Sequence, residues 1–147
     1  LRRADLNATH DHWSAIRLFI AGDREFAAFW SASLNGAELD PPDQLRFNAL
    51  MGEHARATFQ IWDRNRSLGI GAEDFIQSGA PPLARLICTA GGAPWWSRFQ
   101  SEFPSGFVED MNGAVASVLA SAASGDPNHP CGGLPPTAPP APAPVEG

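Results

Sequence analysis

The sequence contains no lysine and no tyrosine, and only four valines among 147 residues. Lysine and tyrosine codons are AT-rich, so a GC-rich genome explains both absences, and neither carries functional information. All ten basic residues are arginines, and the net charge is −6. Nucleic-acid binding requires a basic patch that displaces counterions from phosphates, so this acidic balance argues against nucleic acid as a partner. No run of about 18 apolar residues occurs, so the sequence predicts no membrane span.

The two cysteines, Cys88 and Cys131, are too few for a disulfide framework. Cys88 directly follows Leu86 and Ile87 and is expected to be a buried small hydrophobe. A nucleophilic role would need an activating base beside it. A bridge to Cys131, which lies in a Pro-rich segment, stays open, but the sequence favours two unlinked thiols.

Apolar residues recur at helical spacing, and no segment alternates with period two, so the sequence predicts an all-α fold. We expect a small orthogonal or irregular bundle of about five to six helices in a domain over residues 4–123. Eight of the fourteen prolines fall between Pro127 and Pro144, so residues 124–147 are expected to form a disordered Ala/Pro-rich tail. The expected helices cover residues 4–21, 23–34, 41–66, 73–89 with a fault at 78–82, a short stretch from 94, and 105–119.

Helix boundaries carry the clearest local signals. Asp23 and Asp40 are placed as N-caps, and Asp40 is followed by two prolines that suit the first turn of a helix. The two prolines of 81–82 break a helix that would otherwise continue, because each removes an N–H donor. Gly91 and Gly92 lack the preceding strand of a phosphate-binding loop and are expected to be a helix C-cap.

No constellation of reactive side chains is visible, so we assign no catalytic, cofactor-binding or metal-binding residue. The His10-Asp11-His12 cluster has the wrong spacing for one helix face, and a metal would need ligands from His54 or His129. His54 falls in the apolar stripe of its helix and is expected to be a buried neutral side chain rather than a general base. For an enzyme, the candidate catalytic residues would be His54 together with Glu53 or Glu73.

The aromatic residues of the second half are the most informative feature of the chain. Trp95 and Trp96 are adjacent and cannot both face inward on one helix, so we expect that one is partly exposed or meets another element. An exposed tryptophan beside Phe99 would mark a partner surface, a membrane-interface anchor or the wall of an apolar pocket. The candidate interaction surface or pocket comprises Trp95, Trp96, Phe99, Phe103, Trp62 and His54.

Three stretches, residues 23–30 (DREFAAFW), 45–51 (LRFNALM) and 90–96 (AGGAPWW), resemble in their order an uncharacterised bacterial family. Its members carry the patterns PELAxxW, LxPEERxRFxxLM and PGGRxWW. The resemblance implies an α-helical domain, often preceded by a membrane helix, and it implies no catalytic residues. Ala90 stands where the family pattern has proline, and the Pro81-Pro82 break interrupts a helix that the family runs unbroken.

These observations favour a non-enzymatic helical interaction or accessory domain whose partner is another protein or a second copy. The resemblance adds a membrane-proximal location, with a tether preceding Leu1 and the domain in the cytoplasm or facing it. The alternative is a small-molecule or lipid-binding domain with an aromatic-lined apolar pocket. An enzyme is the least supported class, and we expect no cofactor.

Overall fold

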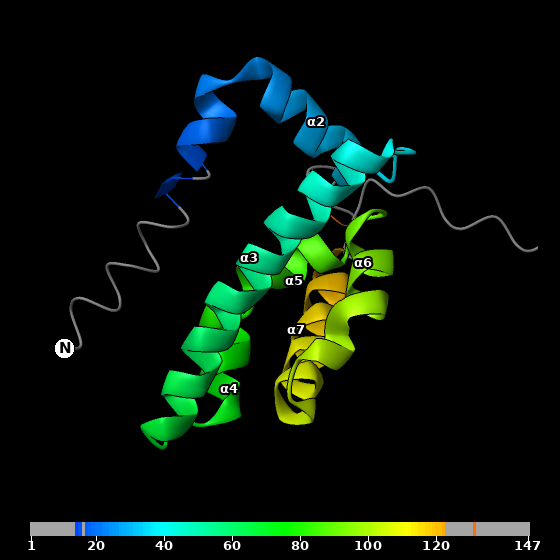
Figure 1. Cartoon of the computed structure of the whole chain (residues 1–147). Helices are drawn as coiled ribbons and strands as arrows, with labels where there is room; N and C mark the ends of the chain where they lie inside the picture. Colours follow the sequence, from blue (N-terminus) through cyan, green and yellow to red (C-terminus); the bar gives the residue numbers. More distant parts are fainter. Residues whose placement is uncertain (1–13, 16, 123–130, 132–147) are drawn as a thin grey trace, which may run out of the picture.

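The computed structural model describes residues 14–15, 17–122 and 131, and this part of the chain is helical without a strand (Figure 1). The fold is an irregular all-α bundle, as the sequence predicts. Residues 14–15 and 17–22 are helical, and this segment ends at Gly22 as expected. The following elements are α2 (Arg24–Leu34), α3 (Pro41–Ser67), α4 (Ala72–Asp74), the π-helical turn η1 (Phe75–Gly79), α5 (Pro81–Ile87), α6 (Gly92–Phe99), the 3₁₀ turn η2 (Gln100–Glu102) and α7 (Ser105–Ala122).

The predicted caps of α2 and α3 are confirmed. The Asp23 carboxylate accepts a hydrogen bond from the Phe26 amide at 3.0 Å, and Asp40 accepts one from the Asp43 amide at 2.9 Å. Each bond satisfies a backbone donor that the first helical turn leaves free. The α2 helix ends at Leu34, before Gly36, which adopts a φ of +81° that favours glycine.

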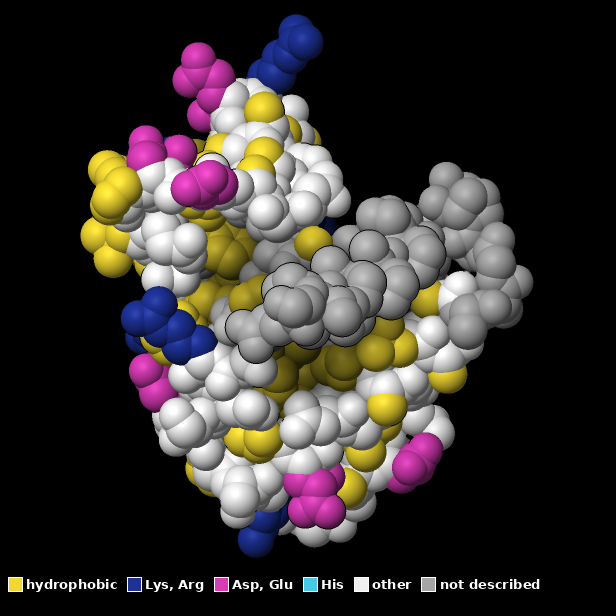
Figure 2. Space-filling model, turned by 90° about the vertical axis from the view of Figure 1, so that its right-hand side faces the viewer, with side chains coloured by type: hydrophobic (Ala, Val, Ile, Leu, Met, Phe, Trp, Pro, Cys, Tyr) yellow, Lys and Arg dark blue, Asp and Glu magenta, His cyan; other side chains and the backbone are white. Residues whose placement is uncertain are grey.

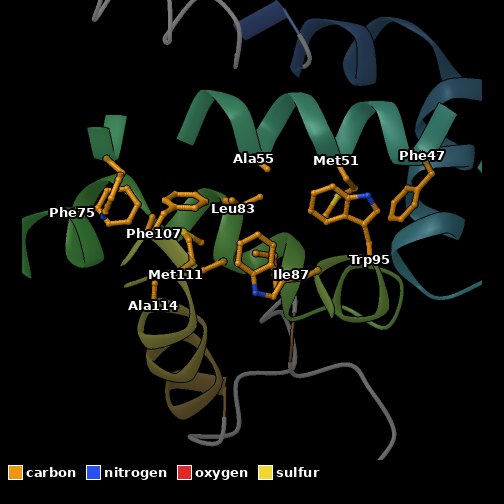
Figure 3. Close-up of a cluster of buried hydrophobic side chains, with 14 of the residues drawn as sticks. Phe47, Met51, Ala55, Phe75, Leu83, Ile87, Trp95, Phe107, Met111 and Ala114 are labelled. Atoms are coloured by element: carbon orange, nitrogen blue, oxygen red, sulfur yellow. The ribbon is translucent and has the colours of Figure 1, made fainter. Parts of the chain in front are cut away.

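The long helix α3 lies across α5, α6 and α7, and the core forms where they meet (Figures 1 and 3). The α3 face that packs there is the apolar stripe to which His54 belongs: Phe47, Met51, His54, Thr58 and Trp62 are all buried. These residues are spaced three or four positions apart, which places their side chains on one side of the helix. The largest fully buried side chains of the core are Phe75, Phe107, Met51, Leu83 and Met111.

The expected fault between residues 78 and 82 is present and has a defined form. Residues Phe75–Gly79 make a π-helical turn, in which the Ala80 amide donates to the Phe75 carbonyl at 2.9 Å. Pro81 and Pro82 then occupy the first turn of α5, where their missing N–H groups cost nothing. The chain thus continues from α4 to α5 with a change of helical geometry rather than a loop.

The expected C-cap role of Gly91 and Gly92 is wrong. The α5 helix ends at Ile87, Gly92 begins α6, and neither glycine has a positive φ. Both are instead required by close backbone contacts: a Cβ atom on Gly91 would lie 1.9 Å from the Ser33 carbonyl oxygen. A Cβ atom on Gly92 would lie 1.8 Å from the Leu86 carbonyl oxygen. Gly91 thus lets the α5–α6 turn pack directly against the end of α2, and Gly92 lets the same turn lie close to the end of α5.

The expectation of two unlinked thiols is also wrong. Cys88 and Cys131 form a disulfide, with their Cα atoms 5.5 Å apart, and both residues are buried. Sequence spacing carries no signal for this bond, because 43 residues separate the two cysteines. Cys131 is the one residue of the Pro-rich tail that the structure describes, and the bond attaches it to the end of α5.

Candidate functional site

The structure buries both tryptophans of the central motif, and of the two expected outcomes it shows the second, in which a tryptophan meets another element. Trp95 is 6% exposed and Trp96 is 5% exposed. Successive side chains on an α-helix point about 100° apart, so two neighbours are both buried where a helix is covered on two sides. The Trp95 side of α6 faces Phe47 and Met51 of α3 (Figure 3), and the Trp96 side faces α7.

Two tryptophans of the candidate set are fixed by polar partners on α7 that sequence reasoning missed. The Trp96 indole N–H donates to Asn112 at 2.9 Å, and the Trp62 indole N–H donates to Asp110 at 2.7 Å. A buried indole N–H usually finds such a partner. Nothing in the local sequence marks these acceptors, since Asp110 lies 48 residues from Trp62. Both rings therefore have a structural role.

Trp95 differs from these two tryptophans. Its indole nitrogen is buried and has no hydrogen-bond partner among the described residues. The ring stacks on its neighbour Trp96 with centroids 6.4 Å apart and lies 5.3 Å from the Phe99 ring. The Trp95 and Phe99 side chains also reach the surface of a hollow at this end of the bundle.

This hollow, which we call the α6 hollow, has a volume of about 330 Å³. It lies between the end of α2 with its following loop, the first turns of α3, and α6. Figure 2 faces the side of the molecule on which α6 lies in Figure 1, and apolar side chains are visible there near the middle of the view. The α6 hollow is lined by Ser33, Gly36, Ala37, Leu39, Gln44, Phe47, Asn48, Ala90, Gly91, Pro94, Trp95, Arg98 and Phe99.

The polar groups of the α6 hollow come from three side chains besides Ser33. Gln44 donates from Nε2 to the Asn48 Oδ1 at 3.0 Å, which fixes the two amides relative to each other. Arg98 is the only charged residue in the lining, and its guanidinium carbon lies 5.3 Å from the Phe99 ring centroid. Flat apolar walls with a few convergent polar groups are typical of small-molecule sites.

The remaining candidate residues lie away from the α6 hollow. Phe103 lines a shallow surface depression between η2 and α7, of about 490 Å³. Trp62 lines a smaller hollow of about 150 Å³ near the end of α3, together with Arg66 and Asp110. Trp96 and His54 belong to the core. The six residues singled out from sequence thus divide among three surface sites and the interior.

The residues considered for enzymatic chemistry do not converge. His54 is buried with its ring centroid 5.7 Å from that of Trp30, as expected for a core histidine. Glu53 lies on the exposed side of α3, 3.3 Å from the Arg56 guanidinium, and Glu73 accepts from Gln77 at 2.6 Å.

Within the described ranges, no group of three or more histidine, cysteine or acidic side chains could hold a metal ion. The His10–His12 cluster and His129 lie outside those ranges. No helix in the described part of the chain combines the length and the apolar character that crossing a membrane requires.

Comparison of the chain with protein-family models, with curated proteins and with solved structures finds no match. The resemblance to the bacterial helical family therefore stays a prediction that rests on the three motifs, and so do the membrane tether and the cytoplasmic location. The functional argument for this chain is built on its own geometry.

Proposed function

We propose that this chain is a helical binding domain that takes a small aryl-bearing molecule into the α6 hollow. The observation that carries the proposal is the lining itself, which brings the aromatic residues Phe47, Trp95 and Phe99 together with the Gln44 and Asn48 amides. A volume of about 330 Å³ lies at the lower end of the range of small-molecule sites, so the fitting ligand has one ring and a short chain.

The probe for this proposal is 3-phenylpropanamide, titrated into the protein and followed by ligand-observed NMR. At about −0.3 kcal/mol per non-hydrogen atom, a compound of this size binds with a free energy of about −3.3 kcal/mol, which corresponds to a Kd of about 4 mM. Ala37 is exposed and lines the hollow, so Ala37→Trp fills the space without entering the core. We expect this variant to weaken binding at least about tenfold, because about 1.4 kcal/mol of contact is lost.

The matched control is Ala116→Trp, which adds the same side chain at an exposed position of α7 outside the lining. This variant is expected to bind the probe like the wild-type chain. Binding that survives Ala37→Trp unchanged, or no binding by the wild-type chain at the solubility limit of the probe, contradicts the proposal.

The second candidate function is the one favoured by the sequence, a non-enzymatic interaction or accessory domain. Because Trp95 and Trp96 are buried, we place its contact surface on the segment formed by residues 14–15 and 17–22 together with α2, which we call the arm. The part of the arm that precedes α2 extends away from the bundle (Figure 1), and on it Leu18 is 71% exposed and Phe19 is 63% exposed. Large apolar side chains grouped on a surface are typical of contact sites.

We take a second copy of the chain as the partner of the arm, because the arm carries no net charge. It carries Arg17 and Arg24 against Asp23 and Glu25, whereas the chain as a whole has a net charge of −6. Two arms therefore approach each other without the repulsion that the remaining surface would impose.

Sedimentation velocity tests this second candidate. We expect the wild-type chain to dimerise and the double variant Leu18→Glu with Phe19→Glu to be monomeric, because four buried carboxylates would have no partners in the interface. Leu119→Glu, at an apolar position of α7 that is 46% exposed, is the control and is expected to leave the dimer intact. A wild-type chain that sediments as a monomer at every concentration would overturn self-association.

A further inference from the structure

The charge of the α6 hollow is opposite in sign to that of the molecule. The chain has 16 acidic and ten basic residues, yet none of the acidic residues that the structure describes lines this hollow, and one arginine does. Asp43, which precedes Gln44 in the chain, is not part of the lining and is paired with Arg46 at 3.4 Å. Arg98 forms no ion pair with any residue that the structure describes.

The Arg98 guanidinium is available to bind a ligand because of its position on α6. It stands in the last turn of that helix, is exposed, and has its guanidinium carbon 5.3 Å from the Phe99 ring centroid. The aromatic face holds the guanidinium by a cation–π contact but uses none of its five N–H donors. A planar fork of donors beside an aromatic wall matches a carboxylate attached to a ring.

The amides on α3 add neutral donors to the same hollow. After Gln44 donates one N–H to Asn48, it keeps a second N–H, and the Asn48 amide keeps both of its own. These groups approach from α3, whereas Arg98 approaches from α6. An anion in the hollow would therefore meet donors from two elements, with no carboxylate in the lining to repel it.

We propose that the natural ligand of the α6 hollow is a small aryl carboxylate whose ring lies against Trp95 and Phe99 and whose anionic group is bound by Arg98. This inference rests on the proposed function and specifies the ligand class of the same site. It requires no covalent step, and the ligand is bound and released unchanged.

The test compares two compounds of the same size and shape, 3-phenylpropionate and its neutral amide, 3-phenylpropanamide, by NMR titration at low salt. The wild-type chain is expected to bind the carboxylate about tenfold more tightly than the amide, the gain of a charge-assisted hydrogen bond at a partly exposed site. Arg98→Gln is expected to bring the ratio of the two affinities close to one. Arg98→Lys retains the charge and is expected to keep part of the preference.

Arg85→Gln is the matched control, since Arg85 is an exposed arginine in the last turn of α5 and lies outside the hollow. It changes the net charge by the same amount as Arg98→Gln and is expected to preserve the tenfold preference. Equal affinity of the wild-type chain for the two compounds, or a preference that persists in Arg98→Gln, overturns the carboxylate assignment and leaves the binding function standing. Failure of both compounds to bind overturns the assignment and the binding function together.

Discussion

Replacing Phe107 with alanine is expected to lower the free energy of unfolding by about 3–5 kcal/mol, the range for removing a buried phenylalanine ring. The side chain has no exposed surface, and α7 places it at the centre of the core (Figure 3). Its ring centroid lies within contact distance of five others: Phe103 at 5.2 Å, Phe59 at 5.4 Å, Trp62 at 5.8 Å, Phe75 at 6.1 Å and Trp96 at 6.2 Å.

The loss is large because these neighbours come from different elements and cannot all move into the space. Trp62 and Trp96 are additionally held by their hydrogen bonds to Asp110 and Asn112, which would have to break for the rings to shift. Urea unfolding followed by tryptophan fluorescence measures the effect. Leu119→Ala, on the exposed part of the same helix, serves as the control and is expected to cost less than about 0.5 kcal/mol. A loss below about 1.5 kcal/mol for Phe107→Ala would show that the aromatic core is not packed as described.

Gly92→Ala is the second substitution with a large expected effect, a loss of at least about 3 kcal/mol. The new Cβ atom would lie 1.8 Å from the Leu86 carbonyl oxygen and 2.9 Å from the Thr89 hydroxyl oxygen. The first of these is a backbone atom at the end of α5, so no side-chain rotation relieves the overlap. The α5–α6 turn would have to open, and this would also displace Trp95 and Trp96.

Thermal unfolding measured by circular dichroism checks this result. The control is Gly22→Ala, where a Cβ atom meets nothing within 4 Å. At the end of a helix, that substitution is expected to be neutral or to raise stability by up to about 1 kcal/mol. An unchanged melting temperature for Gly92→Ala would contradict the close contact between the α5–α6 turn and the end of α5.

The features that were predictable from the sequence are those decided by neighbouring residues. Asp23 and Asp40 cap their helices because an N-cap bond spans only three residues, and the stripe on α3 is buried because its period is that of the helix. The break before α5 follows from Pro81 and Pro82 alone. The π-helical form of Phe75–Gly79 was not predicted from the sequence.

The features that sequence reasoning missed depend on residues far apart in the chain. The burial of both Trp95 and Trp96 requires that α3 and α7 cover opposite sides of α6, and local periodicity carries no information on this. The α5–α6 turn requires glycine at positions 91 and 92 because the backbone carbonyl groups of Ser33 and Leu86 leave no room for a Cβ atom. The Cys88–Cys131 bond likewise joins two residues that are far apart in the chain.

The α6 hollow was only partly predictable, for the same reason. Trp95 and Phe99 stood out as aromatic residues on a short helix, and they do line it. Its opposite wall comes from the α2–α3 loop and the first turns of α3, about 50 residues earlier in the chain. Arg98, the residue on which the ligand class depends, is one of ten arginines and carries no distinguishing local pattern.

The most direct test of the binding function is a ¹H–¹⁵N spectrum of the wild-type chain, whose five tryptophans each give one indole N–H signal, during titration with 3-phenylpropanamide. Binding in the α6 hollow predicts that the Trp95 indole signal shifts together with the Gly36 and Gly91 amides. The indole signals of Trp62 and Trp96, which are bonded to α7, are predicted to stay in place. A Trp95 signal that does not move, or shifts confined to Trp62 and Trp96, would contradict the account.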